Sequence, residues 1–147
     1  MFHPEKPIYK DHFGAGLDQE SKQGDFYIHI GVSESFIAGG YYRPSSSILQ
    51  SIRDAIDYNG EELKQILQQE NFKRTFVDLI EDEQHTNAPK GYSKDHPHID
   101  LLKRKTFAVS KVLSREEVMG ENFIRIVIET YKEMLPFRRY LNKATTV

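Results

Sequence analysis

Residues 25–42, DFYIHIGVSESFIAGGYY, carry the clearest strand pattern of the chain. Apolar residues occupy every second position of residues 25–30, a pattern that predicts a half-buried strand. Residues 31–34 are turn-like, and residues 35–42 then return as a second strand. Two strands joined by so short a turn predict an antiparallel hairpin.

Helical patterns follow the hairpin. An apolar stripe at helical spacing predicts a helix over residues 46–58, and Asn59-Gly60 is a good stop signal. A second helix follows directly and would bury Leu63. Asn71 is the predicted cap of a third, short helix.

The C-terminal part predicts one more strand and a long helix. Residues 106–113 alternate like a strand, and Ser114 precedes Glu117 by the spacing of a capping box. The last helix is expected over residues 121–135, with Pro136 kinking or ending it.

The order of these elements predicts the fold class. Strands come first, then helices, a strand and helices again, which favours α+β over alternating βαβ units. Residues 8–13 could add a short strand, although they alternate poorly, and residues 14–24 are expected to form a polar loop. We therefore predict a single α+β domain over residues 1–147, with a small antiparallel sheet of three to four strands backed by several helices.

Composition excludes several classes of protein. Hydrophobic residues make up 38% of the 147-residue chain and charged residues 29%, which is ordinary for a soluble globular protein. The net charge of −2 disfavours nucleic acid as a partner, and the absence of cysteine excludes disulfides and zinc–thiolate sites. No apolar run reaches the roughly 20 residues of a membrane span. We expect no membrane partner and a cytoplasmic location.

Residues 88–107, APKGYSKDHPHIDLLKRKTF, bring more ionisable groups together beside a predicted strand than any other segment. His96 next to Asp95 could act as a general base, with Lys94 steadying an anion. The preferred interpretation is structural: Asp95 or His96 caps a helix whose first residue is Pro97.

His29 is predicted on the polar face of its strand. With His12 on a neighbouring strand it could form a two-histidine site for a metal or for acid–base chemistry. No acidic residue stands at an obvious ligand spacing, and no HExxH motif is present. We therefore predict no metal site and no cofactor.

Gly39 and Gly40, shortly before Arg43, could let a phosphate approach the backbone. The flanking sequence of a phosphate-binding loop is missing, so a β-bulge is the preferred interpretation. An anion pocket would still form if the fold collected four basic residues, Lys10, Arg43, Lys94 and Lys105.

Short motifs along nearly the whole chain match those of one family in order. They are Lys6, Tyr9-Lys10, His12-Phe13-Gly14, Tyr27-Ile28-His29-Ile30, Gly39-Gly40 with Pro44, Ile52-Arg53 with Ile56, residues 90–97, 101–103 and 105–107, Leu113-Ser114, and Leu141-Asn142. Taken in this order they resemble the domain of unknown function 2461 family of bacteria and fungi. The resemblance implies no reaction, substrate or cofactor.

The resemblance covers the C-terminal two thirds of that family. Its members usually carry several dozen residues before the position of Lys6, including a helical segment and an arginine-rich strand. The chain therefore resembles an N-terminally shortened member. If the missing strand pairs with the hairpin, an open sheet edge is left, and a homodimer could form through it.

Two functions of different class remain. The first is a non-catalytic binding or interaction module whose basic cleft accepts an anionic small molecule. The second is an enzyme that acts on a phosphorylated or other anionic small molecule by His/Asp acid–base chemistry. Either site would draw on residues that could border one cleft: Lys10, His29, Arg43, Tyr92, Lys94, Asp95, His96 and Lys105.

Overall fold

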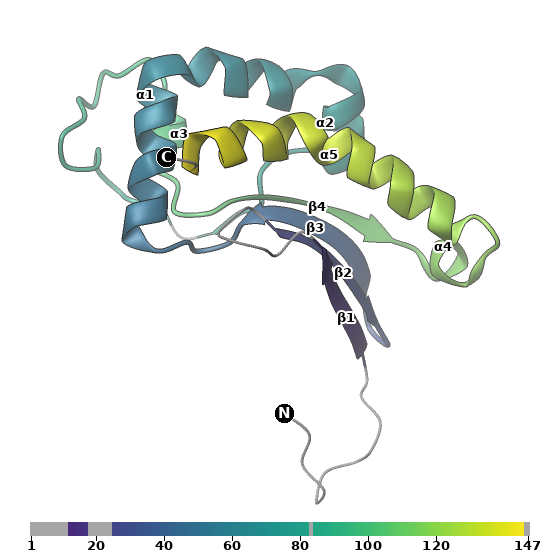
Figure 1. The fold of residues 1–147 in the computed structure, drawn as a ribbon. Helices are drawn as coiled ribbons and strands as arrows, with labels where there is room; N and C mark the ends of the chain where they lie inside the picture. The colour runs from purple at the N-terminus through teal and green to yellow at the C-terminus, as the bar shows by residue number, and fades with distance from the viewer. Residues whose placement is uncertain (1–11, 18–24, 83, 146–147) are drawn as a thin grey trace, which may run out of the picture.

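The computed structural model describes residues 12–17, 25–82 and 84–145, and the statements below concern these residues (Figure 1). The elements in chain order are β1 (His12–Leu17), β2 (Asp25–Gly31), β3 (Ser35–Tyr41), α1 (Ser46–Gln68), α2 (Glu70–Phe76), α3 (Ile99–Leu102), β4 (Phe107–Leu113), α4 (Arg115–Met119) and α5 (Phe123–Thr145).

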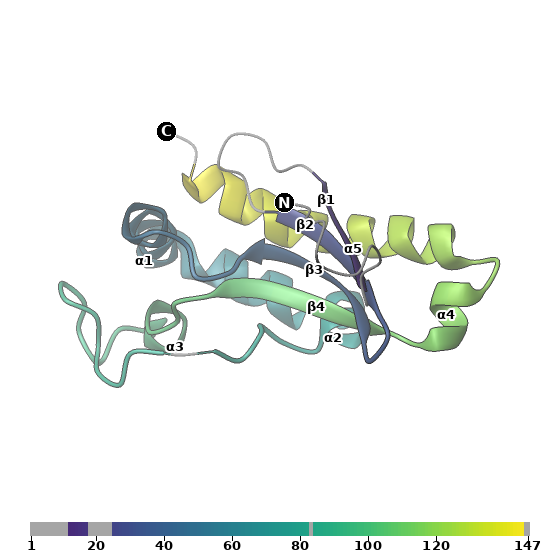
Figure 2. The same cartoon turned by 90° about the horizontal axis from the view of Figure 1, so that it is seen from below.

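The four described strands form one antiparallel sheet in the order β1-β2-β3-β4. The predicted hairpin is β2–β3, with Ile28 opposite Ile37. The long helices α1 and α5 lie over the same face of the sheet (Figures 1 and 2). The predicted α+β class is confirmed. β1 forms one edge of the described sheet, and the homodimer predicted at such an edge stays a prediction.

β1 lies further along the chain than the strand predicted at residues 8–13. It runs into the predicted loop, and residues 8–11 lie outside the described residues. Gly14 and Gly16 have little strand propensity, so the local pattern does not reveal this strand. The strand is instead held by its pairing with β2, in which Gly14 is opposite His29 and Gly16 is opposite Tyr27.

The bulge predicted at Gly39-Gly40 is wrong. Both glycines pair without a skipped residue, Gly40 with Asp25 on one side and with Ala108 on the other. Gly40 has a φ of 110°, and a Cβ there would collide with the carbonyl oxygen of Phe107. Close approach of the β4 backbone is the reason for glycine here.

The core fills the space between the sheet and its helices. Its fully buried members come from both layers: Phe26, Ile37, Phe107 and Val109 from the strands, and Ile52, Ile56, Leu63, Met134, Phe137 and Leu141 from the helices. The stripe predicted for the first helix is therefore the buried face of α1. Among the described helices, none combines the length and the apolar character needed to cross a bilayer.

α1 is interrupted where the sequence predicts a stop. Asn59 has non-helical φ and ψ of −150° and 58°, and its side chain accepts a hydrogen bond from the Glu62 N–H at 3.4 Å. The Tyr140 hydroxyl of α5 donates to the carbonyls of Ala55 and Asn59, at 3.2 and 2.9 Å. Burial raises the pKa of Tyr140 to about 12, so it remains a donor.

Two predicted helix caps are wrong. α2 begins at Glu70, with Gln69 rather than Asn71 at its cap position. α3 begins at Ile99, with His98 at its cap position and no side-chain cap bond, so neither Asp95 nor His96 caps it. Both residues instead lie in the turns that precede the helix. The capping box of Ser114 and Glu117 is confirmed.

Pro136 does not end the last helix, because α5 runs on to Thr145. A helix-interior proline removes one backbone hydrogen bond and costs roughly 3 kcal/mol. Beyond Pro136 the helix buries Phe137, Tyr140 and Leu141. Burying such side chains stabilises by about 1.5–3 kcal/mol each, which outweighs that cost.

The close approach at Gly40 can be tested with a matched pair of glycines. Gly40→Ala should lower the free energy of unfolding by about 3 kcal/mol or more, because Cβ meets backbone atoms that cannot move. Gly91 also has a positive φ, of 95°, but its Cβ would meet nothing within 4 Å. Gly91→Ala should therefore cost only about 1 kcal/mol. Urea unfolding measures both, and equal losses would contradict the collision.

Candidate functional site

A basic pocket lies where β3 passes into α1. Its volume is about 480 Å³. It is lined by the β3–α1 connection, the first turns of α1, residues of the 82–85 segment and the chain that leads into β4: Arg43, Pro44, Ser46, Leu49, Gln50, Arg53, Asp82, His85 and Lys105. We call it the Arg53 pocket.

Arg43 forms one wall and is held from two sides. Its guanidinium donates to both carboxylate oxygens of Asp82, at 3.1 and 2.8 Å. Its backbone N–H donates to the Thr106 hydroxyl at 3.0 Å, and that hydroxyl donates to Asp82 at 2.7 Å. Arg43 is one of two non-glycine residues with positive φ among those described, at 47°. These hydrogen bonds hold a backbone conformation that is otherwise unfavourable.

Arg53 is the buried cation of the pocket, with 8% of its surface exposed. Its guanidinium donates to the carbonyl oxygen of Leu102 at 2.9 Å and to that of Arg104 at 3.4 Å. Among the described residues no carboxylate pairs with it. Burial lowers the pKa of Arg53, with a smaller opposing effect of Tyr92, but an arginine stays charged.

α1 begins at the same pocket, since its first residue, Ser46, is part of the lining. Ser45 caps it by accepting from the Ile48 N–H at 3.4 Å, and the first turn contains no acidic residue. The remaining first-turn N–H groups and the helix dipole favour an anion at this end.

The charges of the pocket are unequal. Among the described residues, three basic side chains, Arg43, Arg53 and Lys105, line it together with one carboxylate, Asp82. Both oxygens of that carboxylate already accept hydrogen bonds from Arg43, and one also accepts from Thr106. An excess of positive charge therefore faces a cavity large enough for a small molecule.

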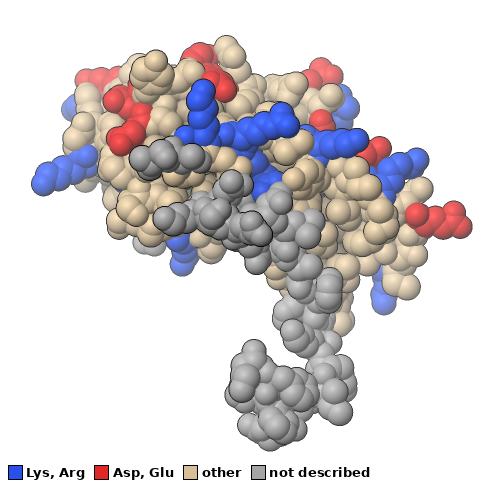
Figure 3. Space-filling model, viewed as in Figure 1, with Lys and Arg blue, Asp and Glu red and all other residues tan. Residues whose placement is uncertain are grey.

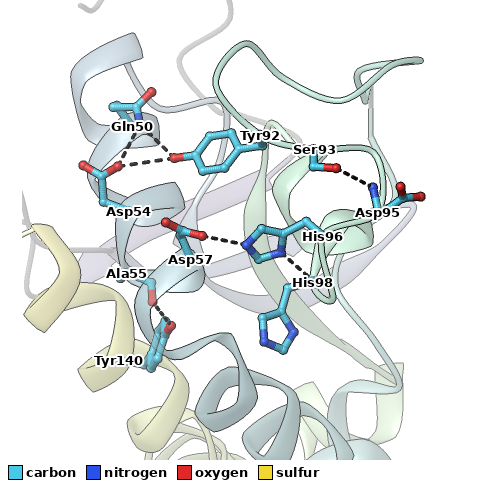
Figure 4. A network of polar contacts seen from close by, with 10 residues as sticks. All are labelled: Gln50, Asp54, Ala55, Asp57, Tyr92, Ser93, Asp95, His96, His98 and Tyr140. Carbon is cyan, nitrogen blue, oxygen red and sulfur yellow. Dashed lines mark hydrogen bonds and ion pairs between the residues drawn. The ribbon is translucent and has the colours of Figure 1, made fainter.

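A polar network joins the pocket to the 91–98 segment (Figure 4). The Gln50 side-chain nitrogen donates to Asp54 at 2.9 Å and to the Tyr92 hydroxyl at 3.0 Å. The Tyr92 hydroxyl donates in turn to Asp54 at 3.3 Å. Burial chiefly raises the pKa of Tyr92, so this hydroxyl keeps its proton.

His96 is held at both ring nitrogens (Figure 4). Nε2 lies 2.6 Å from an oxygen of Asp57, and Nδ1 accepts from the His98 N–H at 3.0 Å. Because Nδ1 is an acceptor, Nε2 carries the proton and donates to Asp57. A ring engaged in this way has no free nitrogen with which to take a proton from a substrate.

His98 packs its ring against Gly60. A Cβ at Gly60 would lie 2.7 Å from the ring atom Cγ, so glycine at this position makes room for the ring. Its Nδ1 is buried and forms no hydrogen bond to the described residues. Burial, and then Lys64 and His96, lower the pKa of His98, while Glu61 acts in the opposite direction.

The predicted site residues fall into separate groups. Arg43 and Lys105 line the Arg53 pocket, and Tyr92 adjoins it through Gln50. His96 contacts Asp57, which lies further along α1 than Gln50. Lys94 and Asp95 are exposed on the turn before α3. His29 stacks on Phe36, ring centroids 4.8 Å apart, on the sheet face away from the core. Lys10 lies outside the described residues.

Several residues that line the pocket were not predicted from the sequence, among them Arg53, Gln50, Asp82 and His85. Arg53 interrupts the buried stripe of α1 between Ile52 and Ile56, and a charged residue in such a stripe is a usable signal. Gln50 and His85 carried no such signal, because an amide on a helix and a histidine in a charged loop are common.

A second basic surface lies along α5. It consists of exposed side chains on one face of the helix, Arg125, Lys132, Arg139 and Lys143, and Figure 3 shows lysines and arginines spread along this side of the molecule. These side chains stand in solvent, where an isolated contact with an anion contributes little.

No three His, Asp or Glu side chains of the described residues gather as a metal-ligand set.

Residues 1–140 match a protein-family model described as a conserved hypothetical protein, DUF2461. Comparison with curated proteins and with solved structures gives no match.

His98, a partly buried residue whose Nδ1 atom is fully buried, leads to a prediction about pH. Its pKa is lowered in the folded protein, so the unfolded chain binds the proton more readily below the ordinary histidine pKa of about 6.5. Stability should therefore fall as the pH drops from 7 towards 5, by up to about 1.4 kcal/mol per pH unit from this residue. His98→Gln removes the titration, and its unfolding free energy should fall less steeply. Equal slopes in urea unfolding would refute this role.

Proposed function

The chain belongs to the DUF2461 family, and because the description of that family names no reaction, we propose a function from the Arg53 pocket: the protein is a binding module for a phosphate-bearing small molecule. The observation that carries the proposal is the buried guanidinium of Arg53. It lines a cavity and has no described carboxylate partner.

Burial of a cation without a counter-charge is unfavourable, because water is removed and little replaces it. The carbonyls of Leu102 and Arg104 compensate Arg53 only in part, since they are neutral dipoles. An anion in the pocket would complete the compensation. The buried charge therefore favours a ligand whose anionic group contacts Arg53 directly.

A phosphate group fits the pocket better than a single carboxylate. A phosphate monoester carries about −1.5 to −2 charges at neutral pH, and the described lining of the pocket has two more basic side chains than carboxylates. Arginine forks match phosphate oxygens in geometry, and the start of α1 adds backbone donors.

The acid–base groups predicted from the sequence have little support in this pocket. His96 has both ring nitrogens engaged, and His29 lies on the sheet face away from the core. Asp82 is held by Arg43 and Thr106, so it too is poorly placed to accept a proton. His85 lines the pocket, but Asp82 is the only carboxylate in the described lining, so we favour binding over catalysis.

Calorimetric titration with inorganic phosphate at low salt tests this function. Lys105→Ala should weaken binding by roughly 10-fold or more, since a charge-assisted hydrogen bond contributes about 1.5–3 kcal/mol. Lys103→Ala is the matched control. It removes an equal charge only two residues from Lys105, and the side chain of Lys103 does not line the pocket. Its affinity should stay within about 2-fold of the parent protein.

A second pair of variants separates the pocket from the α5 surface. Arg53→Lys keeps the charge but loses the planar fork, so it should weaken phosphate binding while leaving most of the packing in place. Arg125→Ala changes only the exposed surface of α5. If Arg125→Ala lowered the affinity and neither Arg53→Lys nor Lys105→Ala did, the proposed site would be wrong.

A further inference from the structure

We propose that the ligand of the Arg53 pocket is a hydroxylated phosphate monoester, and that the side-chain carbonyl of Gln50 recognises its hydroxyl. The inference rests on the proposed function and adds the class of ligand and a residue that determines specificity. It depends on the size of the pocket, the orientation of the Gln50 amide and the hydrogen bonds that both oxygens of Asp82 already accept.

The pocket is larger than inorganic phosphate requires. Its volume of about 480 Å³ lies in the range of roughly 300–1,000 Å³ that encloses whole small-molecule ligands. Pro44 and Leu49 add apolar wall beside the basic side chains. A ligand that fills the space therefore has a carbon skeleton attached to its anionic group.

The network on α1 determines how the amide of Gln50 is turned. Its nitrogen donates both hydrogen bonds of the side chain, one to Asp54 and one to the Tyr92 hydroxyl. The side-chain oxygen of Gln50 points away from these two residues (Figure 4) and accepts no hydrogen bond from the described residues. Since Gln50 lines the pocket, this oxygen offers a hydrogen-bond acceptor to a ligand.

Asp82, the carboxylate of the pocket, is a poorer acceptor for a ligand. One of its oxygens accepts from Arg43, and the other accepts from Arg43 and Thr106. The pocket thus combines basic donors for a phosphate with an oriented amide acceptor. A ligand complementary to both has a phosphate and a hydroxyl donor, and a hydroxyl on the carbon skeleton of a phosphate ester is such a donor.

Tyr92 is a positioning residue in this arrangement. Its hydroxyl accepts from the Gln50 nitrogen and donates to Asp54, so it fixes the nitrogen end of the amide on this side and leaves the oxygen end for a ligand. Without that hydroxyl the amide would retain one partner, Asp54, and could turn more freely. Tyr92, one of the site residues predicted from the sequence, would then affect which ligand binds without contacting the phosphate.

Three probes separate the phosphate from the hydroxyl contribution: inorganic phosphate, propyl phosphate and glycerol 1-phosphate. The two esters have the same carbon chain and differ in their hydroxyl groups. In the parent protein glycerol 1-phosphate should bind about 5- to 10-fold more tightly than propyl phosphate, as expected for one net hydrogen bond. The ratio of the two dissociation constants is the readout, because a general loss of stability affects both esters alike.

Two variants test the role of Gln50. Gln50→Leu, on an exposed part of α1, should bring the ratio to about 1, and Tyr92→Phe should reduce it to about 2–3, since the amide loses one of its two partners. Equal affinities of the parent protein for both esters would overturn the inference while phosphate binding stood. A ratio unchanged in Gln50→Leu would overturn the role of Gln50. Failure of all three probes to bind would overturn the proposed function as well.

Discussion

Burial of the Arg53 guanidinium is the interaction on which this structure depends. Its donors satisfy the carbonyls of Leu102 and Arg104, which end α3 and lead into β4. One side chain of α1 thus positions the chain that enters the sheet. A charged group in this place must be solvated by protein dipoles or by an anion. The structural contact and the proposed binding site are therefore two consequences of the same buried charge.

The surrounding contacts keep that geometry in place. Gly40 lets β3 and β4 approach closely, so that Thr106, just before β4, can bond Arg43 and Asp82. On the other side Gln50 and Tyr92 join the 91–98 segment to α1. The pocket lies between these two contacts, at the N-terminus of the helix that supplies Arg53. Its walls come from segments that are distant in the chain, which explains why local patterns reveal only part of it.

The sequence predicts the elements whose signals are local. The β2–β3 hairpin alternates, the stripe of α1 has helical spacing, and the Ser114 capping box follows a known spacing. Local patterns fail to predict the elements that depend on tertiary packing. β1 contains two glycines, and α5 continues through Pro136 because residues beyond it are buried. The site shows the same division. Arg43 and Lys105 could be proposed from charge, but the placement of Arg53 against the end of α3 depends on the three-dimensional fold.

If the pocket holds a phosphate-like dianion against Arg53, a crystal grown with tungstate, a tetrahedral dianion with strong anomalous scattering, should reveal it. We expect an anomalous peak in the pocket, with tungstate oxygens within hydrogen-bond distance of the guanidinium of Arg53 and of the Lys105 ammonium. Peaks confined to the exposed basic residues of α5, or an empty pocket at saturating tungstate, would contradict it.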